Sequence, residues 1–234
     1  MSSDRVAPEY RIRLKFQRPD PASYSGYGNY ATAMISDAYR KRQTLPPAIK
    51  PVWGPPGRIA GPAITVKATP GDEILALKAI EIAQPGDVII VAGADHHLNC
   101  FWGGIMSTMA KVRGVAALVA DGMIRDVEQC RSAGFPIWAT GVTPVAPNMD
   151  VPPGELNLPI TIGEVTIHPG DLVVADEDGV AIVAQADIGA VAAAVEARIA
   201  KEEAWLEKIH STRQMILKEN VDNLLARRVV EYLD

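Results

Sequence analysis

The sequence predicts an α/β fold, because apolar stretches of strand length alternate with segments of helical periodicity along most of its 234 residues. Apolar residues make up 48% of the chain, enough for the core of one large or two small domains. Three Pro-Gly-Asp turns begin at Pro70, Pro85 and Pro169, and the last two lead directly into apolar strands. We therefore expect a layered core with short connections.

The expected elements follow one another closely and form a core domain over residues 30–186. In chain order they are a helix at 30–42, a proline-rich loop at 45–57, a strand at 63–68, a helix at 73–83, a strand at 87–92, a helix near 104–113, a strand at 115–120, and two strands at 171–175 and 179–183. The acidic turn at 176–179 joins the last two strands. It lacks the spacing of a calcium-binding loop, so a hairpin turn is the favoured interpretation.

Two peripheral regions flank this core. Residues 1–29 are polar, aromatic and rich in turn formers, which predicts an N-terminal arm. Residues 187–234 predict a C-terminal helical region. Asp187 is a suitable N-cap for a long helix that runs to about His210, and a further helical segment follows near residues 221–233. A long helix of this kind can pack across a neighbouring subunit.

Composition argues against several classes of protein. The net charge is −5 and the pI about 5.4, so a basic nucleic-acid-binding surface is not expected. Cys100 and Cys130 are the two cysteines, and neither has a Cys or His partner at metal-ligand spacing, which favours a reducing compartment. No apolar run reaches the roughly 18 residues that span a bilayer. We expect a cytoplasmic protein that binds neither nucleic acid nor membranes.

The most informative segment follows the apolar run at 115–120, where Arg125 and Asp126 stand side by side at the expected end of a strand. In open α/β sheets this is the edge at which ligands bind, and Gly122 is expected to let the backbone approach a small molecule. An arginine can grip a carboxylate with two hydrogen bonds, and an aspartate can hold a hard divalent cation. The alternative is that Asp126 caps the helix beginning at Val127 and Arg125 forms a surface ion pair.

A second candidate segment lies upstream, where Gly103 and Gly104 precede a helical pattern. The first backbone N–H groups of such a helix have no partner within the helix and can bind an anion. We expect the amides of Gly103, Gly104, Ile105 and Met106 to form a carboxylate cradle. Together with Arg125 and Asp126 they would form a site that stabilises an enolate.

These motifs resemble a known family. The matching segments are Trp102 to Gly141, with Gly103-Gly104, Asp121-Gly122-x-x-Arg125-Asp126 and Phe135-Pro136-Ile137-Trp138, and residues 33–38, 61–66 and 169–180. They resemble the family that contains regulator of ribonuclease activity A and the 4-hydroxy-4-methyl-2-oxoglutarate and 4-carboxy-4-hydroxy-2-oxoadipate aldolases. The resemblance covers residues 30–210 approximately. It implies an α/β/α sandwich of the swivelling phosphohistidine-domain type that assembles as a homotrimer or homohexamer with sites between subunits.

The resemblance also implies an activity. The chain is expected to be a divalent-metal-dependent lyase, a class II pyruvate aldolase or oxaloacetate decarboxylase, that cleaves a C–C bond in a small carboxylated 2-oxo acid to give pyruvate. Arg125 matches the arginine that holds the substrate carboxylate, and Asp126 matches the ligand of Mg²⁺ or Mn²⁺. The Gly103 to Met106 amides match the carboxylate cradle.

Two positions depart from the family pattern. Gly104 stands where the aldolases carry Asp or Glu, and the acidic residue after Arg125-Asp126 falls at Glu128, with Gln129 in the expected place. Gly104 thus lacks a carboxylate that could relay a proton. Glu202 of a neighbouring subunit is our candidate for the missing catalytic acid. The natural substrate, the metal and the balance between aldol cleavage and decarboxylation are left open.

Two alternatives accompany this interpretation. The first is a non-catalytic regulator of ribonuclease activity that acts by protein–protein interaction, and the metal ligand Asp126 argues against it. The second concerns Asp95-His96-His97, which resembles the start of a metal site. Adjacent residues of an extended chain point to opposite sides, so both imidazoles cannot easily reach one ion. Contact of His97 or Asn99 with substrate is the better hypothesis.

Overall fold

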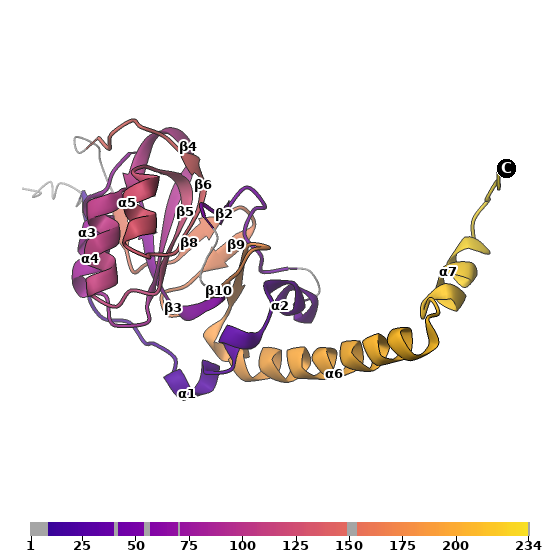
Figure 1. Ribbon diagram of the computed structural model, residues 1–234. Coiled ribbons are helices and arrows are strands. Elements are labelled where there is room, and N and C mark those ends of the chain that lie inside the picture. The colour runs from indigo at the N-terminus through magenta and orange to yellow at the C-terminus, as the bar shows by residue number, and fades with distance from the viewer. Residues whose placement is uncertain (1–8, 40–41, 54–56, 70, 149–153, 234) are drawn as a thin grey trace, which may run out of the picture. The chain divides into compact units, whose positions relative to one another are not determined.

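The computed structural model describes residues 9–39, 42–53, 57–69, 71–148 and 154–233 (Figure 1). The chain divides into two compact units, Met1–Ala192 and Ala193–Asp234. No helix in the described ranges is both long and apolar enough to cross a membrane.

The first unit is built on one large mixed sheet. Its strands lie in the order β1 (Tyr10–Ile12), β7 (Gly154–Leu156), β3 (Ile59–Lys67), β4 (Val88–Trp102), β5 (Ala117–Ile124), β6 (Ile137–Val142) and β2 (Lys50–Pro51), with β10 (Leu172–Ala175) and β11 (Val180–Val183) joined through β3. Strands β3, β4, β5 and β6 are parallel. Their carboxyl ends therefore meet at one edge of the sheet, as expected for a ligand-binding edge.

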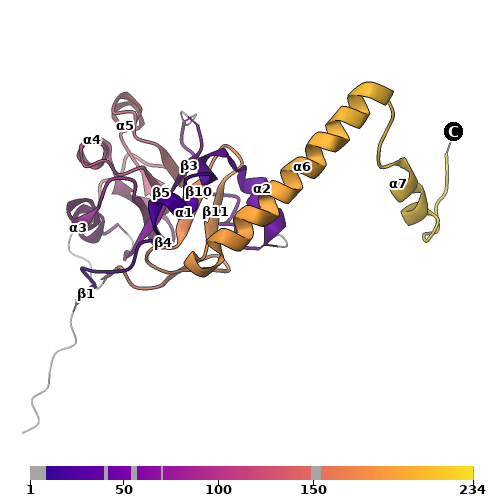
Figure 2. The same cartoon turned by 90° about the horizontal axis from the view of Figure 1, so that it is seen from below.

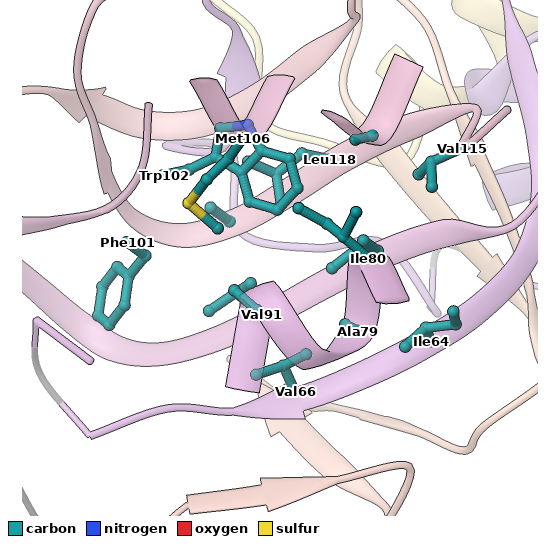
Figure 3. Packing of buried hydrophobic residues seen from close by; sticks show 14 of the residues in the cluster. Ile64, Val66, Ala79, Ile80, Val91, Phe101, Trp102, Met106, Val115 and Leu118 are labelled. Carbon is teal, nitrogen blue, oxygen red and sulfur yellow. The ribbon is translucent and has the colours of Figure 1, made fainter. Parts of the chain in front are cut away.

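Helices cover one face of this sheet (Figure 2): α3 (Ile74–Ile82), α4 (Gly104–Val112) and α5 (Val127–Ser132). Ala79 and Ile80 of α3 and Met106 of α4 belong to the same buried cluster as Val91 and Leu118 of the strands (Figure 3). Each helix follows a parallel strand directly. The N-termini of all three helices therefore lie at the same edge of the sheet as the carboxyl ends of the parallel strands.

Strands rather than helices cover the other face. The hairpin of β8 (Ile160–Ile162) and β9 (Val165–Ile167), together with β10 and β11, packs against Val88, Ile90 and Val119 of the sheet. In β8 and β9 buried and exposed residues alternate, the period of a half-buried strand. The mixed α/β fold is confirmed. The second helical layer of the expected α/β/α sandwich is replaced by strands in the described residues, and the relation to the swivelling phosphohistidine domain stays a prediction.

Residues 9–29 pack on the core, where we expected an arm. Strand β1 pairs with β7, and Arg18 donates two hydrogen bonds of 2.8 Å from Nε and Nη2 to the buried carboxylate of Asp87. The buried Tyr27 hydroxyl donates to the carbonyl oxygen of Ile188 at 2.6 Å. The remaining short helices of this region are α1 (Pro21–Tyr24), the 3₁₀ turn at Tyr27–Asn29 and α2 (Thr32–Ala38), which is shorter than the expected helix.

The acidic turn after β10 is structural. The carboxylate of Asp176 accepts hydrogen bonds from the backbone N–H and the hydroxyl of Thr32, at 2.9 and 2.6 Å, and from the N–H of Asp178 at 3.0 Å. Burial opposes ionisation, but these hydrogen bonds outweigh it and lower the pKa of Asp176. The hairpin interpretation of residues 176–179 is confirmed.

Two C-terminal helices follow: α6 (Ile188–Thr212), preceded by a 3₁₀ turn at Gln185–Asp187, and α7 (Lys218–Leu225). The long helix was expected. The last helix begins earlier and ends sooner than the predicted segment at 221–233.

Candidate functional site

Arg125 and Asp126 lie immediately after β5, at the edge where the carboxyl ends of the parallel strands meet. The expected strand at 115–120 runs on to Ile124, because Gly122 and Met123 pair with β4. The N–H of Arg125 donates to the carbonyl oxygen of Trp102 at the end of β4, at 3.0 Å. The pair is therefore held beside the end of a neighbouring strand.

Gly122 makes room for a buried side chain. A Cβ at Gly122 would lie 2.4 Å from the ring of Phe101, and one at Gly93 would lie 2.5 Å from the same ring. Phe101 is fully buried. The glycines of β4 and β5 thus make room for one aromatic ring, and the approach of a small molecule at Gly122 stays a prediction.

Asp126 caps a helix, but not the one that follows it. Its side chain makes no hydrogen bond to the N-terminus of α5, and its Oδ2 instead accepts from the N–H of Gly104, the first residue of α4, at 3.2 Å. Arg125 Nε lies 3.4 Å from the same oxygen. The alternative in which Asp126 caps its own helix is wrong, and the structure brings together the two segments that we expected to share a site.

The backbone of Asp126 has a conformation that few residues adopt readily. Its φ and ψ of 56° and 44° are left-handed. Such a conformation is costly for most L-residues, and aspartate and asparagine tolerate it best. It is a local strain of the kind that concentrates at functional sites.

Gly103 allows this close arrangement. A Cβ at position 103 would lie 2.7 Å from Asp126 Oδ2 and 3.4 Å from Arg125 Nε. The Gly104 amide is engaged by Asp126, and the N–H of Ser107 donates to the carbonyl oxygen of Gly103. Among the predicted cradle residues, Ile105 and Met106 therefore carry the N–H groups best placed for an anion.

A buried network beneath the site was missed by sequence reasoning. Ser107 Oγ accepts from Trp102 Nε1 at 2.8 Å and lies 3.0 Å from the carbonyl oxygen of Gly103 and 3.1 Å from Cys130 Sγ. Burial raises the pKa of the Cys130 thiol, which donates to the carbonyl oxygen of Arg125 at 3.5 Å. A serine inside an apolar helical stretch, four residues after a glycine, was the available signal.

Arg125 and Asp126 line a hollow of about 340 Å³. Its other lining residues are Val127, Val142, Thr143 and Pro144. No group of three or more His, Cys, Asp or Glu residues within the described ranges could hold a metal ion. Asp126 uses Oδ2 for both of its recorded contacts, so Oδ1 can face a ligand. One carboxylate fits Mg²⁺ or Mn²⁺, because such ions keep several waters and take further ligands from substrate.

Three other predicted residues have different surroundings. Glu202 belongs to the second unit, and its Oε1 accepts from Arg198 Nε of the same helix at 2.6 Å, so its role as an acid stays a prediction. His96 Nε2 accepts from the N–H of Asn99 at 3.0 Å, and Asn99 Nδ2 donates to the carbonyl oxygen of Ala146 at 2.7 Å. These bonds hold the irregular part of β4 together.

Comparisons with known proteins point to one family. Residues 32–182 match the family described as RraA-like, Aldolase/RraA. A protein of Halalkalibacterium halodurans, provisionally named a 4-hydroxy-4-methyl-2-oxoglutarate aldolase, is 39% identical over 152 residues, covering 65% of this chain and 71% of the relative.

Two solved structures are also similar. An unusual member of the RNase ES inhibitor RraA protein family from Streptomyces coelicolor superposes with a TM-score of 0.73 at 28% identity, covering 84% of this chain and 99% of that one. The RNA-processing inhibitor RraA from Thermus thermophilus superposes with a TM-score of 0.59 at 29% identity, covering 65% and 92%.

Proposed function

Because the chain belongs to the Aldolase/RraA family, we propose that it is a lyase that depends on a divalent metal and cleaves a C–C bond in a small carboxylated 2-oxo acid to release pyruvate. The observation that carries the proposal is the junction of Asp126, Arg125 and the N-terminus of α4 at one edge of the sheet. Relatives named as aldolases support the lyase class.

Each residue has a distinct task in this proposal. The guanidinium of Arg125 binds the substrate carboxylate, because its planar fork matches two oxygens. The N–H groups of Ile105 and Met106, at the positive end of the α4 dipole, orient that carboxylate. Asp126 would hold Mg²⁺ or Mn²⁺ through Oδ1 while Oδ2 keeps the α4 cap. When bound, the ion supplies positive charge that favours a developing enolate.

The local structure prepares these groups in advance. The cap on Gly104 ties Asp126 to α4, and the network around Ser107 ties α4 to the backbone of Arg125. A site positioned before substrate binds loses less free energy to ordering. We also propose a trimeric or hexameric assembly and a cytoplasmic location.

The test is a direct assay. Purified protein with Mg²⁺ or Mn²⁺ is incubated with oxaloacetate and with branched 4-hydroxy-2-oxo diacids, and pyruvate is measured. The expected result is metal-dependent pyruvate release that chelation abolishes and added metal restores. Absence of pyruvate from every substrate with either metal would overturn the proposal and favour the regulatory alternative.

A further inference from the structure

The hollow that Arg125 and Asp126 line also has an apolar part, which has no task in the site described above. Val127, Val142 and Pro144 form this apolar wall, and Val142 is 54% exposed. Val142 is the last residue of β6 and pairs in register with Ile124, the last residue of the neighbouring strand β5 (Figure 1). The exposed apolar side chain therefore belongs to the strand end next to the one that Arg125 follows.

Hydrogen bonds of Thr143 hold the apolar wall in place. The N–H of Thr143 donates to the carbonyl oxygen of Ile124 at 2.9 Å, and its hydroxyl donates to the carbonyl oxygen of Leu98 at 3.0 Å. The same hydroxyl accepts from the N–H of Val145 at 3.2 Å. Thr143 thus uses its N–H and its hydroxyl proton within the chain, and its two neighbours in the apolar wall have side chains made only of carbon and hydrogen. The wall is positioned before a ligand binds.

The charged part of the hollow suits a single carboxylate. Among the six described residues that line the hollow, Arg125 is the one cation. Its Nε lies 3.4 Å from Asp126 Oδ2, so its two Nη groups can bind the two oxygens of one carboxylate. Asp126 brings a negative charge to the same hollow. A second carboxylate of a ligand would lie against carbon and near a like charge, which is unfavourable.

We propose that the apolar wall selects the substrate and that Val142 is a specificity-determining residue, an inference that rests on the proposed function. Arg125 binds the C1 carboxylate of the substrate, and the group on C4 lies against Val142. The volume of about 340 Å³ is near the lower end of the range for small-molecule sites, about 300 to 1,000 Å³. The preferred substrate is therefore a 4-hydroxy-2-oxo monoacid with a small alkyl group on C4.

Cleavage of such an acid gives pyruvate and an uncharged aldehyde. The C3–C4 bond breaks, the 4-hydroxyl loses its proton as it becomes the aldehyde carbonyl, and C3 gains a proton to form the methyl group of pyruvate. The analogue with a carboxylate on C4 undergoes the same change, and its aldehyde product carries a charge. The two substrates therefore differ in the group that meets the apolar wall and not in the bond that breaks.

Binding is measured first, with two 2-oxo acids that lack the 4-hydroxyl and cannot undergo aldol cleavage. 2-Oxopentanoate has a methyl group on C4, and 2-oxoglutarate has a carboxylate there. Calorimetry on the Mg²⁺-loaded protein is expected to give an affinity for 2-oxopentanoate that is about 10-fold or more higher. Pyruvate release from the 4-hydroxy forms of the same two acids then gives kcat/KM for each, with the same expected preference.

Three variants test the role of Val142 in both measurements. Val142→Lys places a cation beside the C4 group and should reverse the preference, while Val142→Thr, which is similar in shape and adds a hydroxyl, should reduce it. Val145→Lys should keep the native preference. It is a matched control, because Val145 is 38% exposed, is not among the described lining residues and keeps its backbone hydrogen bond to Thr143. Thermal unfolding checks the fold of each variant.

The outcomes separate this inference from the proposed function. Equal affinity of the native protein for the two acids, or tighter binding of 2-oxoglutarate, would overturn the inference, while pyruvate release from any substrate would keep the proposed function. A native preference in both Val142→Lys and Val142→Thr would overturn the assignment of Val142. If the native protein prefers 2-oxopentanoate but releases pyruvate from no substrate, the proposed function is wrong and the selectivity of the hollow stands.

Discussion

The side chain of Gln129 lies directly on Gly104. A Cβ at position 104 would lie 2.2 Å from Gln129 Oε1, 2.6 Å from its Cβ and 3.0 Å from its Cδ. These are the two positions at which the resemblance to the aldolases led us to expect an acidic residue. The Gln129 side chain of α5 therefore occupies the space that a side chain at position 104 of α4 would need.

This contact changes how an acid should be restored at position 104. Gly104→Asp alone is expected to lower the melting temperature, because the Gln129 Cβ cannot rotate away. Gly104→Asp with Gln129→Gly should recover part of the loss, although glycine in a helix costs about 0.5 to 1 kcal/mol. The double variant should raise aldol cleavage more than decarboxylation. Additive effects on melting temperature across Gly104→Asp, Gln129→Gly and their combination would contradict the coupling.

Asp126→Asn should keep the fold and lose metal-dependent pyruvate release. Asparagine tolerates the left-handed backbone and keeps a side-chain oxygen for the Gly104 amide, but it lacks the charge for a cation. Asp126→Ala should also unfold more readily, by about 1 to 2 kcal/mol, because alanine has the full left-handed penalty. Urea unfolding and metal titration separate the two effects. Asp222→Asn, on the exposed surface of α7, is the control.

Arg125→Lys should not preserve activity. A lysine has one point charge, whereas the guanidinium offers a planar fork to a carboxylate. We expect a rise in KM for the 2-oxo acid, measured by steady-state kinetics, with Arg131→Lys on the exposed side of α5 unchanged. If Arg125→Lys kept the native KM and kcat, another residue would have to bind the substrate carboxylate.

Ser107→Ala should lower stability by about 1 to 3 kcal/mol, because Trp102 Nε1 loses its buried acceptor. It should also raise KM for the 2-oxo acid, since Ser107 contacts the carbonyl of Gly103 that begins the cradle. Denaturant unfolding and kinetics measure both effects. Thr212→Ala, which removes a hydroxyl that donates to the carbonyl oxygen of Lys208 at 2.7 Å at the exposed end of α6, should change neither, and equal effects of the two variants would argue against the network.

The ionisation of Asp176 should contribute to the way the free energy of unfolding changes with pH in the acid range. Its pKa is lowered in the folded protein, so ionised Asp176 contributes stability above its unfolded pKa of about 3.9. That contribution is lost as the pH falls from the unfolded pKa through the folded one. Asp176→Asn should therefore be less stable at neutral pH and lose less stability between neutral pH and the acid range. Glu177→Gln should keep the native pH profile.

The sequence predicted the parts that depend on local pattern. Alternating strands and helices, and the position of Arg125 and Asp126 at a strand end, follow from periodicity over a few residues. The irregular half of β4 could not be predicted, because its register shifts between Ala92 and Trp102 break the two-residue period. For that reason the strand predicted at 87–92 is shorter than β4, which runs to Trp102.

The missed contacts join residues far apart in sequence. Asp126 caps a helix that begins 22 residues earlier, and local rules could only suggest the helix that follows it. Strands β8 to β11 cover one face of the sheet because short apolar segments pack onto it. The sequence of a short apolar segment does not determine which strand it will pair with or pack against.

Phe101 fills the place of two side chains that Gly93 and Gly122 lack. A larger residue at either glycine would collide with the ring, while a smaller residue at position 101 would leave a cavity beside Gly93 and Gly122. None of these three positions can vary alone without cost. The segment of β5 that delivers Arg125 to the edge is therefore open to evolutionary change only through concerted substitutions, and this restricts the paths by which the chain could acquire a new specificity.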